Sequence, residues 1–177
     1  MKYCAFLRGV NVKGTNMKMV DVCKVFSEAG MQNVTSVLAS GNILFSSDKN
    51  SLELKETLEK AMSNFFNYDC NLFLKNEQEV LEIINQNPFE KADHLHIYSF
   101  VGIEGIENIL MQYFEKADKF ENEMAKIVGE NFYWQVPKNC TLESSFGKIL
   151  GKKELKDKMT SRNSNTIEKI VHKLNSI

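Results

Sequence analysis

The feature that most constrains the fold is the order of apolar patterns, which switch between strand-like and helix-like spacing along the 177 residues. In the first half this order is β, α, β, β, α, β, and the two middle strands flank Gly41-Asn42, a pair typical of a two-residue hairpin turn. Asn50 and Glu53 carry the signature of a helix capping box. The predicted elements are residues 3–10, 19–29, 34–40, 43–47, 50–65 and 70–74.

The second half repeats the same order of patterns. Asn76 and Glu79 predict a capping box on a leading helix, and Asn165 and Glu168 predict another at the start of the last helix. The predicted elements are residues 76–86, 95–102, 106–114, 124–128, 131–136, 145–158, 159–162 and 166–174.

These patterns predict an α+β fold of two tandem ferredoxin-like (βαββαβ) units, with mainly antiparallel sheets and a C-terminal helix. Both halves place an asparagine directly before three apolar residues of a strand, Asn42 in the first and Asn131 in the second. The expected domains are residues 1–75, and residues 76–177 with the leading and C-terminal helices.

Composition excludes several classes of protein. The apolar share of 43% and charged share of 25% are those of a globular chain, and no apolar run is long enough for a signal peptide or membrane span. The four cysteines lie far apart in sequence, which favours reduced thiols and a cytoplasmic location. A net charge of −1 argues against a duplex-DNA binder.

The charges are distributed unevenly along the chain. Residues 76–147 carry 5 Lys or Arg and 13 Asp or Glu, whereas residues 148–177 carry 8 Lys or Arg and 3 Asp or Glu. The two segments could therefore attract each other within the fold or in a homodimer.

A polar corner is predicted in the first unit. In a βαββαβ unit the end of the first strand and the turn between the second and third strands meet at one end of the sheet. This brings a guanidinium, two amides, a hydroxyl and flexible backbone N–H donors together, a combination that suits an anion or a nucleotide-like ligand. The residues concerned are Arg8, Gly9, Asn11, Ser40, Gly41 and Asn42. The alternative is that the glycine and asparagine only form a turn and the arginine only an ion pair.

Two familiar chemistries are not supported. Residues 9–14 match the first six positions of a Walker A loop, but Thr15-Asn16 follows where Lys and Ser or Thr are required, and Lys13 precedes the second glycine. His94 and His96 share a strand face but lack a third ligand at recognisable spacing, so we expect no metal and no cofactor.

Three further groups have two interpretations each. Arg162 and Asn163 either join Arg8 around one pocket or belong to a capping loop. Lysines at 148, 152 and 156 would form a basic stripe on one helix face. This stripe either faces solvent or contacts a partner, which would be RNA or an acidic protein. The aromatic residues at 132–134 either stack on single-stranded RNA or pack in the core, and core packing is favoured because the RNP1 pattern is absent.

Three segments, RGVNVKGTNMKM (8–19), SGNILF (40–45) and TSRNSNTIEKI (160–170), resemble bacterial domain-of-unknown-function family 1697. The resemblance implies ferredoxin-like units and no established activity. The family's motif positions correspond here to Arg8, Gly9, Asn11, Ser40, Gly41, Asn42, Arg162, Asn163, Asn165 and Thr166. Lys13 stands where the family tends to have a small residue, and Ser164 where an aromatic is common. If that aromatic covers a ligand in the family, we expect this chain to bind it weakly or to bind a different one.

The leading functional hypothesis is a binding module for a small anionic or nucleotide-like ligand at the polar corner. An enzyme using the same pocket is the second hypothesis, although no nucleophile or general base is evident, so whether the chain is an enzyme stays open. The third is an interaction protein without a small-molecule site, with single-stranded RNA or a second copy of the chain as its partner.

Overall fold

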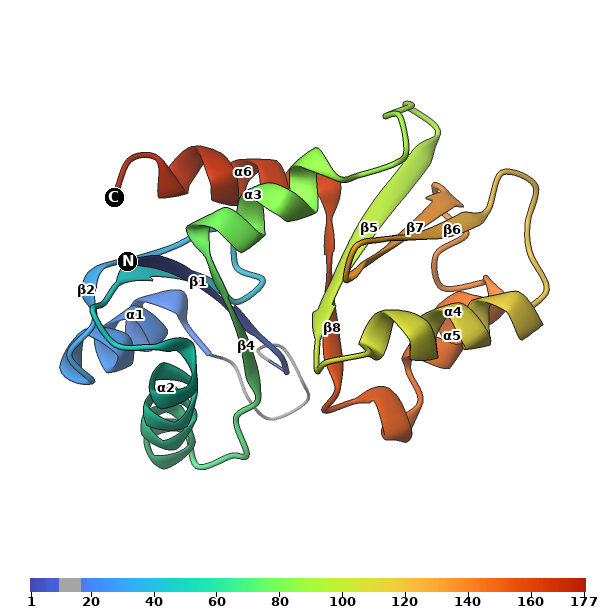
Figure 1. Cartoon of the computed structure of the whole chain (residues 1–177). Coiled ribbons are helices and arrows are strands. Elements are labelled where there is room, and N and C mark those ends of the chain that lie inside the picture. The colour runs from blue at the N-terminus through green and yellow to red at the C-terminus, as the bar shows by residue number, and fades with distance from the viewer. Residues whose placement is uncertain (10–16) are drawn as a thin grey trace. The chain divides into compact units, whose positions relative to one another are not determined.

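The computed structural model describes residues 1–9 and 17–177 (Figure 1). The chain forms two compact units, the first from Met1–Leu81 with Thr166–Ile177 and the second from Glu82–Asn165. This grouping assigns the C-terminal residues to the first unit, whereas the sequence-based division kept residues 76–177 together. The predicted fold class is confirmed: each unit has a four-stranded antiparallel sheet with helices, in the ferredoxin-like order.

The first unit has the order βαββαβ. Its elements are β1 (Lys2–Leu7), α1 (Met19–Glu28), β2 (Gln32–Ser36), β3 (Asn42–Ser46), α2 (Ser51–Phe66) and β4 (Leu72–Asn76). The sheet order is β2-β3-β1-β4, and each pair of neighbouring strands is antiparallel. Both α1 and α2 cover one face of this sheet (Figure 1). Leu54, Leu58 and Met62 of α2 recur at four-residue spacing and are fully buried, which is the amphipathic pattern that the sequence predicts.

Two predicted capping boxes are present in the first unit. Asn50 Oδ1 accepts from the Glu53 backbone N–H at 3.0 Å and thereby starts α2. Asn76 Oδ1 accepts from the Glu79 N–H at 3.0 Å, and the Glu79 carboxylate accepts from the Asn76 N–H at 2.8 Å. This pair starts α3 (Glu77–Asn85). Each box satisfies backbone donors that the first turn of a helix otherwise leaves without a partner.

The second unit repeats the topology. Its elements are β5 (Leu95–Gly102), α4 (Ile106–Lys116), β6 (Met124–Val128), β7 (Asn131–Pro137), α5 (Ser145–Leu150), the 3₁₀ helix η1 (Lys153–Leu155) and β8 (Met159–Asn163). The sheet order is β6-β7-β5-β8, again antiparallel. Phe146 of α5 lies at the centre of an aromatic core and contacts the rings of Phe114, Phe132 and Trp134. The aromatic run 132–134 is therefore core, as the sequence favoured.

Three predicted boundaries are wrong. Gly41-Asn42 is no two-residue turn, because β2 ends at Ser36 and five residues connect it to β3. The helix predicted over 145–158 ends at Leu150, so the lysines at 148, 152 and 156 do not share a helix face. The last helix, α6 (Ser164–Leu174), begins two residues before Thr166, because the Asn163 side chain accepts from the Asn165 N–H at 3.0 Å and caps it.

Within residues 1–9 and 17–177, no helix combines the length and the apolar character that crossing a membrane would require. All four cysteines are free thiols, with Cys4 and Cys70 buried. Burial raises the pKa of Cys70 to about 11, so this thiol stays protonated at neutral pH.

Candidate functional site

The predicted corner lies where β1 ends beside the loop between β2 and β3. The Leu7 backbone N–H donates to the Gly41 carbonyl at 2.7 Å, and the Arg8 N–H donates to the Asn71 carbonyl at 3.2 Å. The end of β1 therefore contacts the β2–β3 loop and the residue just before β4. Gly9 follows with a φ of 76°, a left-handed conformation that suits glycine. The end of the first strand and the loop between the second and third strands thus meet, as the order of elements predicts, through the backbone of Leu7, Arg8 and Gly41.

Asn42 shapes this corner from inside. Its side chain is fully buried, and its Nδ2 donates to the Val37 carbonyl at 2.9 Å and to Ser40 Oγ at 2.9 Å. The Val37 N–H in turn donates to the Asn42 carbonyl at 2.9 Å. Both amide hydrogens thus hold the loop at residues 37–41 in place. Direct contact of Asn42 with a ligand stays a prediction.

The same loop contains one unusual backbone conformation. Leu38 has a φ of 60°, in the left-handed region that a leucine rarely adopts, and its side chain is 47% exposed. Sequence reasoning missed this residue, because nothing in its type suggests a positive φ. An exposed leucine therefore lies two residues from Ser40, which is also exposed. Asn11 and Lys13, the other predicted features of the corner, lie outside the described residues.

Arg162 belongs to the second unit, on β8, where it pairs with Ser99 of β5. Its side chain is buried, and its Nη1 donates to Thr160 Oγ1 at 2.6 Å and to the Ser161 carbonyl at 2.8 Å. Asn163 caps α6 with its Oδ1. The hypothesis that these two residues join Arg8 around one pocket stays a prediction.

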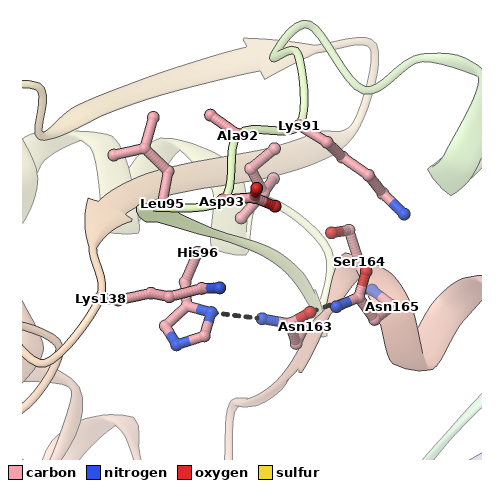
Figure 2. A pocket seen from close by; sticks show the side chains of 10 residues that line it. Lys91, Ala92, Asp93, Leu95, His96, Lys138, Asn163, Ser164 and Asn165 are labelled. Atoms are coloured by element: carbon pink, nitrogen blue, oxygen red, sulfur yellow. Dashed lines mark hydrogen bonds between the residues drawn. The ribbon is translucent and has the colours of Figure 1, made fainter.

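The second unit contains a cavity of about 180 Å³ that sequence reasoning did not find (Figure 2). It lies between the segment before β5, the start of β5, the residue after β7 and the junction of β8 with α6. Asn163 Nδ2 lies 3.2 Å from His96 Nδ1 and donates to it when that ring nitrogen is unprotonated (Figure 2). Burial, and then the nearby Lys138 ammonium, lower the pKa of His96 below its usual value. The lining residues are Lys91, Ala92, Asp93, Leu95, His96, Ile97, Lys138, Asn163, Ser164 and Asn165.

A buried carboxylate in the second unit has a structural role. Glu123 is 5% exposed, and its Oε1 accepts from Trp134 Nε1 at 3.0 Å and from Ser144 Oγ at 2.6 Å. Its Oε2 accepts from the Phe120 N–H at 3.0 Å. Ser144 Oγ also accepts from the Gly147 N–H at 3.0 Å and caps α5. The hydroxyl is thus fully used, so this Ser–Glu pair fixes α5 rather than forming a nucleophile. Among residues 1–9 and 17–177, no three His, Cys, Asp or Glu side chains converge to hold a metal ion.

The fold and these sites define an α+β chain of two ferredoxin-like units, in the first of which the β2–β3 loop is hydrogen-bonded to the end of β1. A family model described as "Protein of unknown function (DUF1697)" matches residues 1–133, and the chain belongs to this family. The resemblance to this family is thereby confirmed, and the segments 8–19 and 40–45 lie within the matched residues.

The chain is also similar to a solved structure, the conserved bacterial protein SP0830 from Streptococcus pneumoniae. The identity is 19%, the TM-score is 0.79, and the likeness covers 98% of each chain. At this identity the likeness establishes the shared fold. No curated protein matches the chain.

Proposed function

We propose that the protein binds a small anionic or nucleotide-like ligand at the corner formed by Arg8, Gly9, Ser40 and Gly41. The observation that supports this function is the 2.7 Å hydrogen bond from the Leu7 N–H to the Gly41 carbonyl, which joins the end of β1 to the β2–β3 loop. Three groups lie within two residues of this hydrogen bond along the chain: the cationic Arg8, Gly9 with its positive φ, and the hydroxyl of Ser40. A guanidinium offers paired N–H donors that match carboxylate and phosphate oxygens.

Leu38 supports the nucleotide-like form of the ligand. Its left-handed backbone costs on the order of 1 kcal/mol, and such conformations persist where the surrounding structure enforces them, often at binding loops. The exposed side chain places apolar surface on the loop that carries Ser40. A ligand with an anionic end and an apolar ring would use both features.

Within this proposal, Asn42 and Arg8 have different roles. Asn42 positions the loop, because its Nδ2 hydrogens bond Val37 and Ser40. Arg8 supplies the charge that attracts the ligand. Replacing Arg8 should therefore weaken binding and leave the loop intact, whereas replacing Asn42 should disturb the loop itself.

The test compares wild type with Arg8→Ala across nucleotides, phosphosugars and carboxylates, first by thermal shift and then by calorimetry. Lys60→Ala is the matched control, because Lys60 is an exposed cation on α2 of the same unit. We expect at least one ligand to bind wild type and Lys60→Ala equally and to bind Arg8→Ala about tenfold more weakly. If no ligand binds wild type more tightly than Arg8→Ala, the proposal fails.

A cytoplasmic location belongs to the same proposal. It is supported by the four free thiols, since oxidising compartments favour paired cysteines. Immunolocalisation of a tagged chain in cells of its source tests it, and enrichment outside the cytoplasm would contradict it.

A further inference from the structure

The cavity of the second unit is a separate site from the corner, because all of its lining residues lie between Lys91 and Asn165. Its volume of about 180 Å³ exceeds the roughly 150 Å³ of a cavity that holds benzene. A small organic acid or a phosphate group therefore fits, whereas a nucleotide would extend outside.

The charges around this cavity favour an anion. Lys91 and Lys138 contribute two ammonium groups, and Asp93 contributes one carboxylate (Figure 2). Burial, and then the Lys138 ammonium, lower the pKa of His96, which lies beside this cation in the cavity.

A second and independent observation concerns the Ser164 hydroxyl. Ser164 is 8% exposed, lines the cavity and points into it (Figure 2). Within residues 1–9 and 17–177 its hydroxyl forms no hydrogen bond, whereas the adjacent Asn163 uses both polar atoms of its amide. Because this hydroxyl has no partner in the described part of the chain and keeps accessible surface in the cavity, it can donate to a ligand oxygen there.

We propose that this cavity binds a small oxyanion, a carboxylate or phosphate group, between the ammonium groups of Lys91 and Lys138, with the Ser164 hydroxyl donating a hydrogen bond to it. The Asp93 carboxylate limits the charge that the site accepts, which favours a group with one net negative charge over a polyphosphate. The site is built from residues of the second unit alone and does not depend on the corner at Arg8.

The experiment is a titration of the full ¹⁵N-labelled chain with inorganic phosphate and, in parallel, with acetate, at constant ionic strength. We expect saturable shifts of the backbone amides of His96, Ser164 and Asn165 with at least one of the two probes. Tighter binding of phosphate identifies a phosphate ligand, and tighter binding of acetate identifies a carboxylate. The proposal is overturned if neither probe produces saturable shifts at these amides, or if shifts occur only at Leu7 and Gly41.

Variants then separate a built site from general charge attraction. Lys138→Met and Ser164→Ala should each weaken binding about tenfold, because each removes a hydrogen bond to a charged group. Lys116→Met removes the same charge from an exposed position on α4 and should leave affinity unchanged. Equal weakening by Lys116→Met and Lys138→Met would overturn the proposal. The amide spectrum of each variant verifies its fold. Loss of binding in Arg8→Ala has no bearing on this cavity, so the failures of the two proposals are distinguishable.

Discussion

Glu123 and Asn42 are polar side chains with almost no exposed surface, and neighbouring groups use their hydrogen-bonding atoms. The Glu123 carboxylate accepts three hydrogen bonds, and the Asn42 amide donates two within its loop. Buried polar groups are costly unless they are paired. Residues of this kind resemble active-site residues in a sequence, but here their hydrogen bonds fix local structure.

Replacing Glu123 tests this interpretation. Glu123→Ala leaves the Trp134 indole N–H and the Ser144 hydroxyl without their acceptor in the core, so we expect the free energy of unfolding to fall by about 3 kcal/mol. Urea denaturation followed by tryptophan fluorescence measures this change. Glu121→Ala is the control, since Glu121 is exposed and its loss should cost no more than about 0.5 kcal/mol. Equal effects of the two substitutions would contradict a structural role for Glu123.

His96 predicts a pH dependence of stability. Its pKa in the folded protein is lowered by burial and by Lys138, so the unfolded chain binds more protons than the folded one. Stability should therefore fall as the pH is lowered from about 7 to 5, through the usual histidine range. Protonation of Nδ1 would also remove the acceptor that Asn163 uses.

The measurement is the free energy of unfolding of His96→Gln and wild type over this pH range. The variant should lose less stability than wild type. His172→Gln replaces an exposed histidine of α6 and should behave as wild type does. A wild-type pH slope in His96→Gln would refute the prediction.

At the scale of elements, the starts of helices and their buried faces could be predicted, because both depend on residues close together in the sequence. The capping boxes at Asn50 and Asn76 and the buried stripe of α2 are local, because a cap or a helix face depends on residues three or four positions apart. The meeting of β1 with the β2–β3 loop also followed from the order of elements. The length of that loop did not, because its shape depends on the Asn42 amide and on the left-handed Leu38.

The cavity of the second unit could not be predicted from patterns. Lys91, Lys138 and Ser164 lie far apart in the sequence, and no spacing rule connects them. Each residue type is also common on surfaces, so none was a signal by itself. Only the pairing of β5 with β7 and β8 brings these segments together.

For Gly147 of α5, helix propensity and the surrounding structure predict opposite effects of an alanine substitution on stability. Gly-to-Ala within a helix normally stabilises by up to about 1 kcal/mol. Here a Cβ at Gly147 would lie 1.9 Å from the Thr141 carbonyl oxygen, so the backbone would have to move. We expect Gly147→Ala to lower the free energy of unfolding by about 2 kcal/mol or more.

Thermal and urea denaturation provide the measurement. Gly151→Ala is the control, because Gly151 has a φ of −79° and its Cβ would come no closer than 3.4 Å to the Lys148 carbonyl oxygen. This substitution should change stability by less than about 1 kcal/mol. A stabilised Gly147→Ala variant would show that the approach of Thr141 is not a constraint.

At the scale of the whole molecule, the first unit is completed by the C-terminal segment. Ile167, Ile170 and Leu174 of α6 are each no more than 1% exposed, and Lys2 Nζ donates to the Leu174 carbonyl at 2.8 Å. Complete burial of such side chains contributes about 1.5–3 kcal/mol each. The segment Thr166–Ile177 is thus grouped with the first unit, and it carries three fully buried side chains.

Removal of residues 166–177 should therefore destabilise the first unit by on the order of 5 kcal/mol. Hydrogen exchange of the amides of β1 and β3 measures this loss directly. Removal of residues 175–177 alone leaves the three buried side chains in place and serves as the control. Unchanged exchange in the longer truncation would show that the first unit does not need this segment.

The discontinuous first unit has a consequence for the order of events on the ribosome. Domains usually fold as they emerge, the N-terminal one first. Here residues 82–165 are translated before Thr166–Ile177, so the second unit has its full complement of residues while the first still lacks its C-terminal segment, which carries three buried side chains. The part of the chain that is synthesised first is thus the last to reach its native state, and until translation passes Leu174 the surface that α6 covers is available to chaperones.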